Sequence, residues 1–339
     1  MTHLVKLLLT SLSCSFLISC GGEEGSANNQ FEIVDYAGSI ERIDSRVDDL
    51  IPANANIQKL AEGFIFTEGP VWDRRNSQLY FSDVRNNTIY SWSESEGVKV
   101  FISPVYAEPT EHPSVGSNGL TIDSEGRLIL MEHGYHRVSR LEADGSRTTL
   151  VDSYREMRLN SPNDVAHHSN GWLYFTDPPY GMAGLEDDPA RELEYNGIYR
   201  LSPTGELQLL ERNQSRPNGL VFSPDEETLY VANSDGENMV WYAYTVIHGI
   251  IGNQRVFYDA NDQTETGAAD GMKVDVNGNI FATGPGGVWI FDPEGVHLGT
   301  IKPDEVPANV AWGDDGSTLY MTARTGLYRL KLNTSGNIP

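Results

Sequence analysis

Apolar and polar positions follow a phrase that recurs along most of the chain. Each copy has a polar residue, a short apolar strand, a turn that contains Asp or Gly, and a second strand rich in apolar and aromatic residues. The copies recur at intervals of about 40 to 55 residues, which indicates a repeat architecture. We call the polar residue that opens each copy its anchor; the anchors are Glu68, Asn118, Asn163, Asn218, Asp270 and Asn309.

The strands within one copy are short and alternate roughly between apolar and polar residues. A second strand such as 172–177 is clear in each copy, and a third strand such as 287–291 follows in most copies. Four short antiparallel strands per copy are typical of a propeller blade, so six copies predict an all-β, six-bladed β-propeller over residues 32–339. We expect residues 31–66 and the final strand 327–332 to close the ring together.

Two other β architectures fit this pattern less well. The repeat is too long for one coil of a β-solenoid, and a pair of β-sandwiches gives no reason for one polar anchor in each period. The sequence also contains no amphipathic helical pattern of useful length between the strands. The pattern therefore favours the propeller.

Residues 1–19 have the layout of a lipoprotein signal peptide. Lys6 precedes an apolar run, and the run ends in LISC at residues 17–20, which resembles a bacterial lipobox with Cys20 as the lipidated residue. Residues 20–31 are polar and Gly-rich, so we expect a lipidated, flexible tether. This predicts attachment to the periplasmic or extracellular face of a bacterial membrane, the outer membrane if the host has one. A plain signal peptide and a wrongly assigned start are the alternatives.

The composition narrows the class of partner. The chain has 339 residues, with 48 acidic and 24 basic residues and a formal net charge of −24. Such a surface repels nucleic-acid phosphates and anionic lipid headgroups and attracts cations, so we expect no nucleic-acid partner and no membrane contact beyond the lipid. Both cysteines lie within residues 1–20, so the folded body can hold neither an internal disulfide nor a cysteine-based metal site. We expect a monomer.

The anchors form a candidate metal site. An anchor that precedes the innermost strand of every blade lies at one mouth of the central channel, where all six anchors converge. Two of them are carboxylates and four are carboxamides, and such oxygen donors suit a hard divalent cation, Ca²⁺ before Mg²⁺. The alternative is that Asn-Gly and Asp-Gly only form turns. Six anchors at blade spacing favour the site.

Several phrases in the chain point to a known family. The most specific are TEGPVW at 67–72, SPNDV at 161–165, FTDPPYG at 175–181, RPNGL at 216–220 and ADGM at 269–272. With them the chain resembles the gluconolactonase-like proteins, related to regucalcin (senescence marker protein), over about residues 57–330. The resemblance implies a six-bladed propeller that hydrolyses sugar lactones and related cyclic esters.

The resemblance also implies the ligands of one divalent metal, for which Ca²⁺ is our first expectation. Carried over to the matching phrases of this chain, the ligands are Glu68, Asn163, Asn218 and Asp270. We expect Asn118, Asn163 and Tyr180 to bind substrate. The longest loop between strands, 178–195, contains Tyr180 and is expected either to cover the mouth as a lid or to be an ordinary surface insertion.

Lactone hydrolysis needs a polarised carbonyl and an activated water. A cation can offset the charge that develops on the carbonyl oxygen, and a carboxylate beside it can accept a proton from water. Asp270 is the better candidate base, although a bound metal would weaken it by lowering its pKa. His133 in the phrase Glu-His-Gly is the second candidate for proton transfer, and the resemblance supports it. We expect His136 at the surface.

Other functions remain open for the same architecture. The same metal site could serve a metal-dependent esterase or phosphotriesterase, or an enzyme acting on aromatic lactones. A propeller can also be a non-catalytic platform that binds a sugar, a peptide or calcium, because a fold does not determine a function. The platform hypothesis gives no reason for the carboxylates of Glu68 and Asp270 on the axis.

Overall fold

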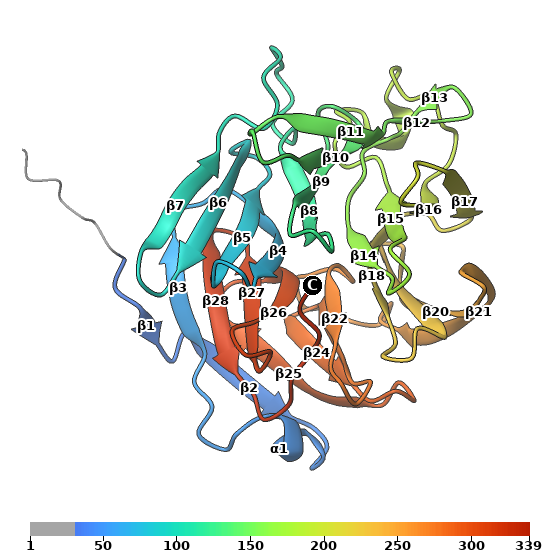
Figure 1. Ribbon diagram of the computed structural model, residues 1–339. Helices are drawn as coiled ribbons and strands as arrows, with labels where there is room; N and C mark the ends of the chain where they lie inside the picture. Colours follow the sequence, from blue (N-terminus) through green and yellow to red (C-terminus); the bar gives the residue numbers. More distant parts are fainter. Residues whose placement is uncertain (1–30) are drawn as a thin grey trace, which may run out of the picture.

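The computed structural model describes residues 31–339, whose strands form six large antiparallel sheets arranged around a central axis (Figure 1). The six-bladed β-propeller predicted from the repeat is therefore confirmed. Helical structure in this part of the chain is limited to the short helix α1 (Val47–Leu50) and the 3-10 turn η1 (Leu185–Asp187). Among residues 31–339, no helix is long and apolar enough to cross a membrane. The predicted signal peptide and tether lie outside the described residues, apart from Phe31.

Blades 1 to 4 each consist of four strands that follow one another along the chain. Blade 1 contains β4 (Thr67–Asp73), β5 (Gln78–Asp83), β6 (Thr88–Ser93) and β7 (Gly97–Ile102). Blade 2 contains β8 (Ser117–Ile122), β9 (Leu128–Glu132), β10 (Arg137–Leu141) and β11 (Arg147–Val151). Blade 3 contains β14 (Val165–His167), β15 (Leu173–Asp177), β16 (Gly197–Leu201) and β17 (Leu207–Glu211). Blade 4 contains β18 (Pro217–Phe222), β19 (Thr228–Asp235), β20 (Asn238–Ile247) and β21 (Ile250–Asp259).

Blades 5 and 6 combine strands from both ends of the described chain. Blade 5 contains β22 (Met272–Val274), β23 (Ile280–Gly284), β24 (Gly287–Phe291) and β25 (His297–Pro303), with β2 (Gly38–Arg42) as an outer fifth strand. Blade 6 contains β26 (Pro307–Gly313), β27 (Thr318–Ala323) and β28 (Gly326–Lys331), followed outward by β3 (Gln58–Glu62) and β1 (Val34–Asp35). The strands β12 (Ser153–Tyr154) and β13 (Met157–Arg158) form a separate ribbon between blades 2 and 3.

The ring closes by pairing between the N-terminal strand β3 and the C-terminal strand β28. These strands run antiparallel, with Leu327 opposite Ala61 and Arg329 opposite Gln58. The sequence predicted this closure, but it did not predict that β2 would extend blade 5. Pairing of β2 with β25 adds a second connection between the two ends of the chain. Hydrogen bonds along both strands stabilise this connection.

The hydrophobic core lies between neighbouring blades. Val71 of blade 1, for example, packs in one cluster with Leu120 and Leu130 of blade 2. Trp72 of blade 1 stacks on Tyr320 of blade 6, with their ring centroids 5.3 Å apart. Because each blade buries both faces against its neighbours, its strands are apolar on both sides, and this explains the continuous apolar runs in the second strands.

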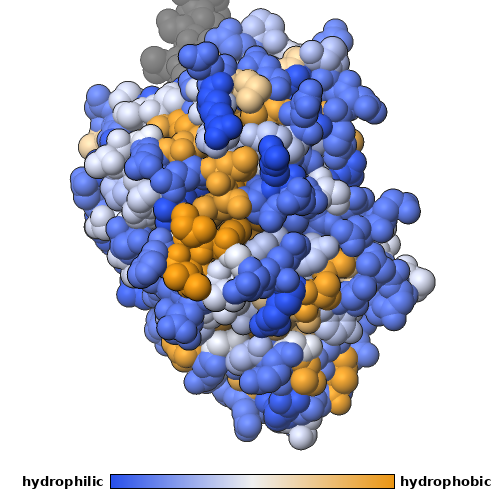
Figure 2. Space-filling view, turned by 90° about the vertical axis from the view of Figure 1, so that its right-hand side faces the viewer, coloured by the Kyte–Doolittle hydropathy of each residue, from blue (hydrophilic) through white to orange (hydrophobic). Residues whose placement is uncertain are grey.

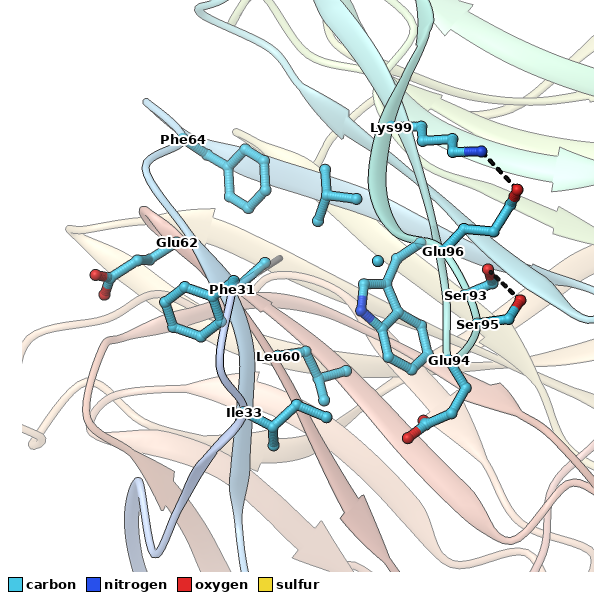
Figure 3. Close-up of a pocket in the computed structure, with 14 residues that line it drawn as sticks. Phe31, Ile33, Leu60, Glu62, Phe64, Ser93, Glu94, Ser95, Glu96 and Lys99 are labelled. Carbon is cyan, nitrogen blue, oxygen red and sulfur yellow. Dashed lines mark hydrogen bonds and ion pairs between the residues drawn. The ribbon is translucent and has the colours of Figure 1, made fainter. Parts of the chain in front are cut away.

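The outer surface is mostly polar and carries hollows that lie away from the anchors. The face seen in Figure 2 is mainly hydrophilic, with one apolar strip across it. A hollow of about 420 Å³ lies on the outer strands, where Phe31, Ile33 and Leu60 lie across from the β6–β7 hairpin (Figure 3). Its rim carries an ion pair between Lys99 and Glu96 at 2.5 Å. The anchors lie elsewhere, on or directly before the innermost strands.

Candidate metal and catalytic site

Irregularities in the innermost strands position several anchors. The pairing of β4 with β5 shifts register between Glu68 and Val71, and β8, β18 and β26 shift in the same way beside their own anchors. Such a bulge bends the strand and turns a side chain away from its regular direction. The bulges therefore lie where each of these strands begins, at the channel mouth.

The glycine that follows an anchor is a site of close contact between blades. A methyl group at Gly119 would lie 2.6 Å from the carbonyl oxygen of Asn163, the anchor of the next blade, whose oxygen accepts a 2.7 Å hydrogen bond from the Gly119 amide. A methyl group at Gly219 would overlap the backbone of Asp270. These Asn-Gly pairs thus lie within strands and hold neighbouring anchors together, and they do not form the hairpin turns of the alternative hypothesis.

Three carboxylates gather on the axis. Glu68 and Asp164 are only 2% and 3% exposed, whereas Asp270 is partly exposed at the mouth. The side-chain amide of Asn309 donates to both buried groups, at 3.2 Å to Oε2 of Glu68 and 3.5 Å to Oδ2 of Asp164. Sequence analysis missed Asp164 as a site residue. The available signal was its position directly after Asn163, where four other blades carry glycine.

Burial raises the pKa values of all three carboxyl groups. It raises the pKa of Glu68 to about 7, with a further contribution from the charge of Asp164. Burial also raises the pKa of Asp164. The pKa of Asp270 lies well above its ordinary value, because burial and the negative charges of Glu68 and Asp164 all raise it. Lys273 on β22 lowers the pKa values of Glu68 and Asp164. Three carboxyl groups in one desolvated space therefore favour the binding of either protons or a cation.

The donor atoms at this mouth fit a divalent cation. Within residues 31–339, no three His, Cys, Asp or Glu side chains are close enough to hold a metal by themselves, so amide oxygens would have to complete the coordination. The side-chain nitrogen of Asn218 donates to Ser234 at 3.2 Å, which leaves its oxygen free. The side-chain oxygen of Asn118 is buried without a hydrogen-bond partner. Asn309 instead uses its oxygen on the Val310 amide, at 2.8 Å.

Tyr180 connects the loop 178–195 to the candidate ligands. Its hydroxyl hydrogen bonds to Ser234, the same side chain that accepts from Asn218. Burial raises the pKa of Tyr180 to about 12, so the phenol stays protonated at neutral pH. The loop is attached to blade 4 by an ion pair between Glu186 and Arg216 at 2.8 Å. Tyr180 and Asn218 therefore share Ser234 as a hydrogen-bond partner.

A buried acid holds the segment that leads to Asn163. Asp177, the last residue of β15, accepts 2.8 Å hydrogen bonds from the backbone amides of Asn160 and Ser161. In blade 1, Asp83 accepts bonds from two amides of the segment before Glu68 in the same manner. These acids were visible in the sequence as the polar ends of second strands. They act on the anchors by positioning the backbone.

His133 lies in a dry position behind the loop 178–195. It is 1% exposed, and a methyl group at Gly181 would lie 2.6 Å from its Cβ, so the loop packs directly on it. Burial lowers the pKa of His133 to about 3, which keeps the ring neutral. The expectation that His136 lies at the surface is wrong: its ring is partly buried and contacts the carbonyl oxygen of Asn160. The 133–136 turn, closed by a 3.1 Å hydrogen bond from the His136 amide to the carbonyl oxygen of His133, places the ring against Asn160.

Comparison with known proteins identifies relatives over most of the chain. Residues 66–325 match the model of the SMP-30/Gluconolactonase/LRE-like region. The chain is 36% identical to the gluconolactonase of Zymomonas mobilis over 311 residues, which cover 88% of this chain and 87% of that protein. It is 28% identical to the pentonolactonase of Haloferax volcanii, over 76% of this chain and 81% of that protein.

A solved structure agrees with the sequence matches. The gluconolactonase of Xanthomonas campestris superimposes with a TM-score of 0.79 at 29% identity, over 89% of this chain and 97% of that chain. The residues 66–325 that match the family model include all six anchors.

Proposed function

Because the chain belongs to the SMP-30/gluconolactonase/LRE-like family, we propose that it is a Ca²⁺-dependent hydrolase that opens sugar lactones or related cyclic esters. The observation that carries the proposal is the group of three carboxyl groups at one channel mouth. Burial and mutual repulsion disfavour the ionised form of these groups, and a bound cation would stabilise that form. A site that only needed to be stable would not bury these groups together. Glu68, Asn163, Asn218 and Asp270 would hold the ion.

Each side chain at the mouth has a separate task in ester cleavage. A bound divalent cation would supply positive charge beside the carbonyl oxygen as negative charge develops there. Asp270, the partly exposed acid, accepts a proton from the attacking water as the water oxygen bonds to the carbonyl carbon. The ring C–O bond then breaks, and the same proton passes to the departing ring oxygen to give a hydroxy acid. Asn118 and Tyr180 orient the substrate hydroxyls.

His133 is the second candidate for proton transfer. Its low pKa means that the neutral ring is present throughout the physiological range, but its burial against Gly181 separates it from bulk water. Asp270 is partly exposed at the mouth and faces the other two acids. We therefore assign proton acceptance to Asp270.

The test is a substrate panel with and without a chelator. Purified protein should hydrolyse glucono-δ-lactone and a pentonolactone in a pH-indicator assay, lose that activity in chelator, and recover it on addition of Ca²⁺. A phosphotriester and an aromatic lactone in the same panel test the other enzymatic hypotheses. If no lactone is cleaved with Ca²⁺, Mg²⁺, Mn²⁺ or Zn²⁺ in excess, the enzymatic proposal is wrong and the platform hypothesis gains support.

We also propose that the protein is a monomer held at a membrane by lipid on Cys20. The proposal rests on the sequence of residues 1–20 and on the high negative charge, which opposes direct contact with anionic headgroups. Cys20→Ser should release the protein from the membrane fraction or leave it unprocessed. A processed variant that stays in the membrane fraction would contradict the anchor, and light scattering would test the monomer.

A further inference from the structure

A lysine side chain faces the central channel. Lys273 lies on β22, one of the innermost strands around the centre of the ring (Figure 1). Its neighbours Met272 and Val274 pack into the core between blades 4 and 5, so the alternation of the strand directs Lys273 away from that core. Lys273 also lines a hollow of about 180 Å³ with Thr121 of blade 2 and Trp312 of blade 6. Residues from separate blades share such a hollow only near the axis.

The buried acids of the mouth lie directly beside this hollow. Val165 lines the hollow, and the residue before it is Asp164. Asn309, which donates its side-chain amide to both buried acids, packs on the backbone two residues before Lys273. A methyl group on the glycine there would lie 2.0 Å from Cγ of Asn309. Glu68 and Asp164 are thus within electrostatic reach of the Lys273 ammonium group, which lowers the pKa values of both.

The ammonium group of Lys273 is not held in a direct ion pair. Its Nζ donates to the backbone carbonyl oxygen of Met272 at 3.1 Å, and no salt bridge within residues 31–339 includes Lys273. Glu226 lines the same hollow, but its carboxylate accepts a 2.7 Å hydrogen bond from the Ser169 amide and lies 3.3 Å from Nδ1 of His168. The positive charge of Lys273 therefore acts on the acids at the axis.

The charges at the mouth follow from these groups. When Glu68, Asp164 and Asp270 are all ionised, they carry three negative charges, and Lys273 reduces the net charge to two negative units. One divalent cation then neutralises the mouth, whereas a trivalent cation would leave it positive. In a desolvated space, such an imbalance costs more free energy than it does at an exposed surface.

We propose that Lys273 is a fixed counter-charge that makes the mouth select a divalent cation over a trivalent one. The inference rests on the proposed cation site and adds the residue that sets its charge. Lys273 acts on the ion through space and is not a ligand, so its role is in specificity. With a divalent ion bound, the mouth is neutral and does not repel the negative charge that develops on the carbonyl oxygen.

The experiment measures the ratio of the Kd for Ca²⁺ to the Kd for Tb³⁺. Competition between the two ions at pH 7, followed through Tb³⁺ luminescence, gives this ratio. Both ions take oxygen ligands and displace the same protons at the mouth, so proton competition cancels in the ratio. Lys273→Met removes a positive charge, and a trivalent ion gains more from this removal than a divalent ion. The ratio should rise about three- to tenfold, as expected for one unit of charge several ångströms away.

Two variants serve as controls for the charge. Lys273→Arg keeps the charge and should keep the wild-type ratio. Lys302→Met removes a positive charge from the same blade, but Lys302 lies on the outer strand β25, where it pairs with Glu41 at 2.9 Å. Salt screens such a surface charge, so this variant should also keep the wild-type ratio. A general loss of structure would weaken the binding of both ions and would not raise the ratio.

A second neutral variant, Lys273→Gln, protects the test against misfolding, and thermal unfolding shows which variants are folded. An unchanged ratio in a folded neutral variant would overturn the role of Lys273 and leave the cation site intact. A wild-type protein that binds neither ion would instead overturn the cation site itself, so the two failures are distinguishable.

Discussion

The two ends of the central channel are built from the same strands but have opposite character. At one end, the buried carboxyl groups of Glu68 and Asp164 and the partly exposed one of Asp270 lie around the axis. At the other end, the same innermost strands contribute Leu220, Val274 and Trp312, and the C-terminal residues Asn337 and Pro339 complete the wall. Figure 1 shows the C-terminus at the centre of the ring. One mouth is thus polar and irregular, whereas the other is a hollow of about 180 Å³ where apolar side chains lie beside Lys273 and Glu226 and the C-terminal residues form part of the wall.

The C-terminal tail is attached to the ring by specific contacts. Thr334 donates to Asp275 at 2.7 Å, and the Val276 amide donates to the carbonyl oxygen of Ser335 at 2.9 Å. Gly336 lies so close to the Trp312 ring that any side chain there would overlap it. Trp312 is 2% exposed, and its ring N–H donates to the carbonyl oxygen of Val274 at 2.8 Å. These contacts make the opposite end a stabilising region.

The comparison shows how stability and chemistry are separated along one strand. Gathering the buried carboxylates of Glu68 and Asp164 beside Asp270 costs stability unless a cation balances them, whereas burying Trp312 and its neighbours contributes stability. We therefore expect changes at the anchor end to affect catalysis and metal binding, and changes at the opposite end to affect unfolding.

The largest effect is expected for Asp270→Asn. The substitution keeps the size and one oxygen, so the fold should survive, but it removes the proposed proton acceptor. Loss of general-base help alone lowers kcat by about 10²–10⁴-fold. The measurement is lactone hydrolysis at saturating Ca²⁺ with thermal unfolding as the control for folding. If excess Ca²⁺ restores activity, Asp270 is only a ligand and His133 becomes the preferred proton acceptor.

At the opposite end, Trp312→Ala should lower the free energy of unfolding by about 3–5 kcal/mol, the usual cost of removing a buried tryptophan. It should leave the Ca²⁺ affinity of the folded protein within threefold of wild type, because the side chain lies away from the anchors. Urea unfolding and calorimetric Ca²⁺ titration measure the two quantities. A large loss of affinity with little loss of stability would contradict the separation of the two ends.

Glu68→Gln should affect Ca²⁺ binding more than folding. A ligand that binds only the native state stabilises it by about 2.7 kcal/mol at a hundredfold excess over Kd. Ca²⁺ should therefore raise the melting temperature of chelator-treated wild type, and the variant should lose most of that rise. The variant without Ca²⁺ should melt no lower than wild type without Ca²⁺, because it removes a buried charge. Equal Ca²⁺-induced shifts in both proteins would exclude Glu68 as a ligand.

Much of the fold was predictable because the signal is repeated. Each anchor phrase is local, and six copies specify six blades even though their sequences differ. The strand β2 was not predictable, since Gly38–Arg42 carries no such phrase and pairs with Gly299–Pro303 far along the chain. A pairing of this kind depends on the closed ring, which brings the two segments together only after the blades have formed.

The site was predictable in its anchors but not in its neighbours. Asp164 reaches the axis because it follows an anchor on an innermost strand, and a sequence gives no register between blades. His136 was misplaced because its direction depends on a turn in which its φ is +52°, a left-handed conformation that the sequence does not reveal. The contact of Tyr180 with Ser234 joins two blades, and only the folded ring shows it.

The smallest effect concerns pH and isolates the anchor end. The pKa of Glu68 is raised to about 7 in the folded protein without metal, so below pH 7 this carboxyl group holds a proton that Ca²⁺ must displace. The Ca²⁺ affinity should therefore fall as the pH decreases through 7, by about tenfold, or 1.4 kcal/mol, for each pH unit and displaced proton. The raised pKa of Asp270 acts in the same direction and steepens the change.

Calorimetric titration at pH 5.5, 6.5, 7.5 and 8.5 measures the slope of Ca²⁺ affinity against pH. Glu68→Gln should reduce this slope by one proton. Trp312→Ala, at the opposite end, should keep the slope of wild type; an affinity that does not change with pH would show that the three carboxyl groups are already ionised without the cation.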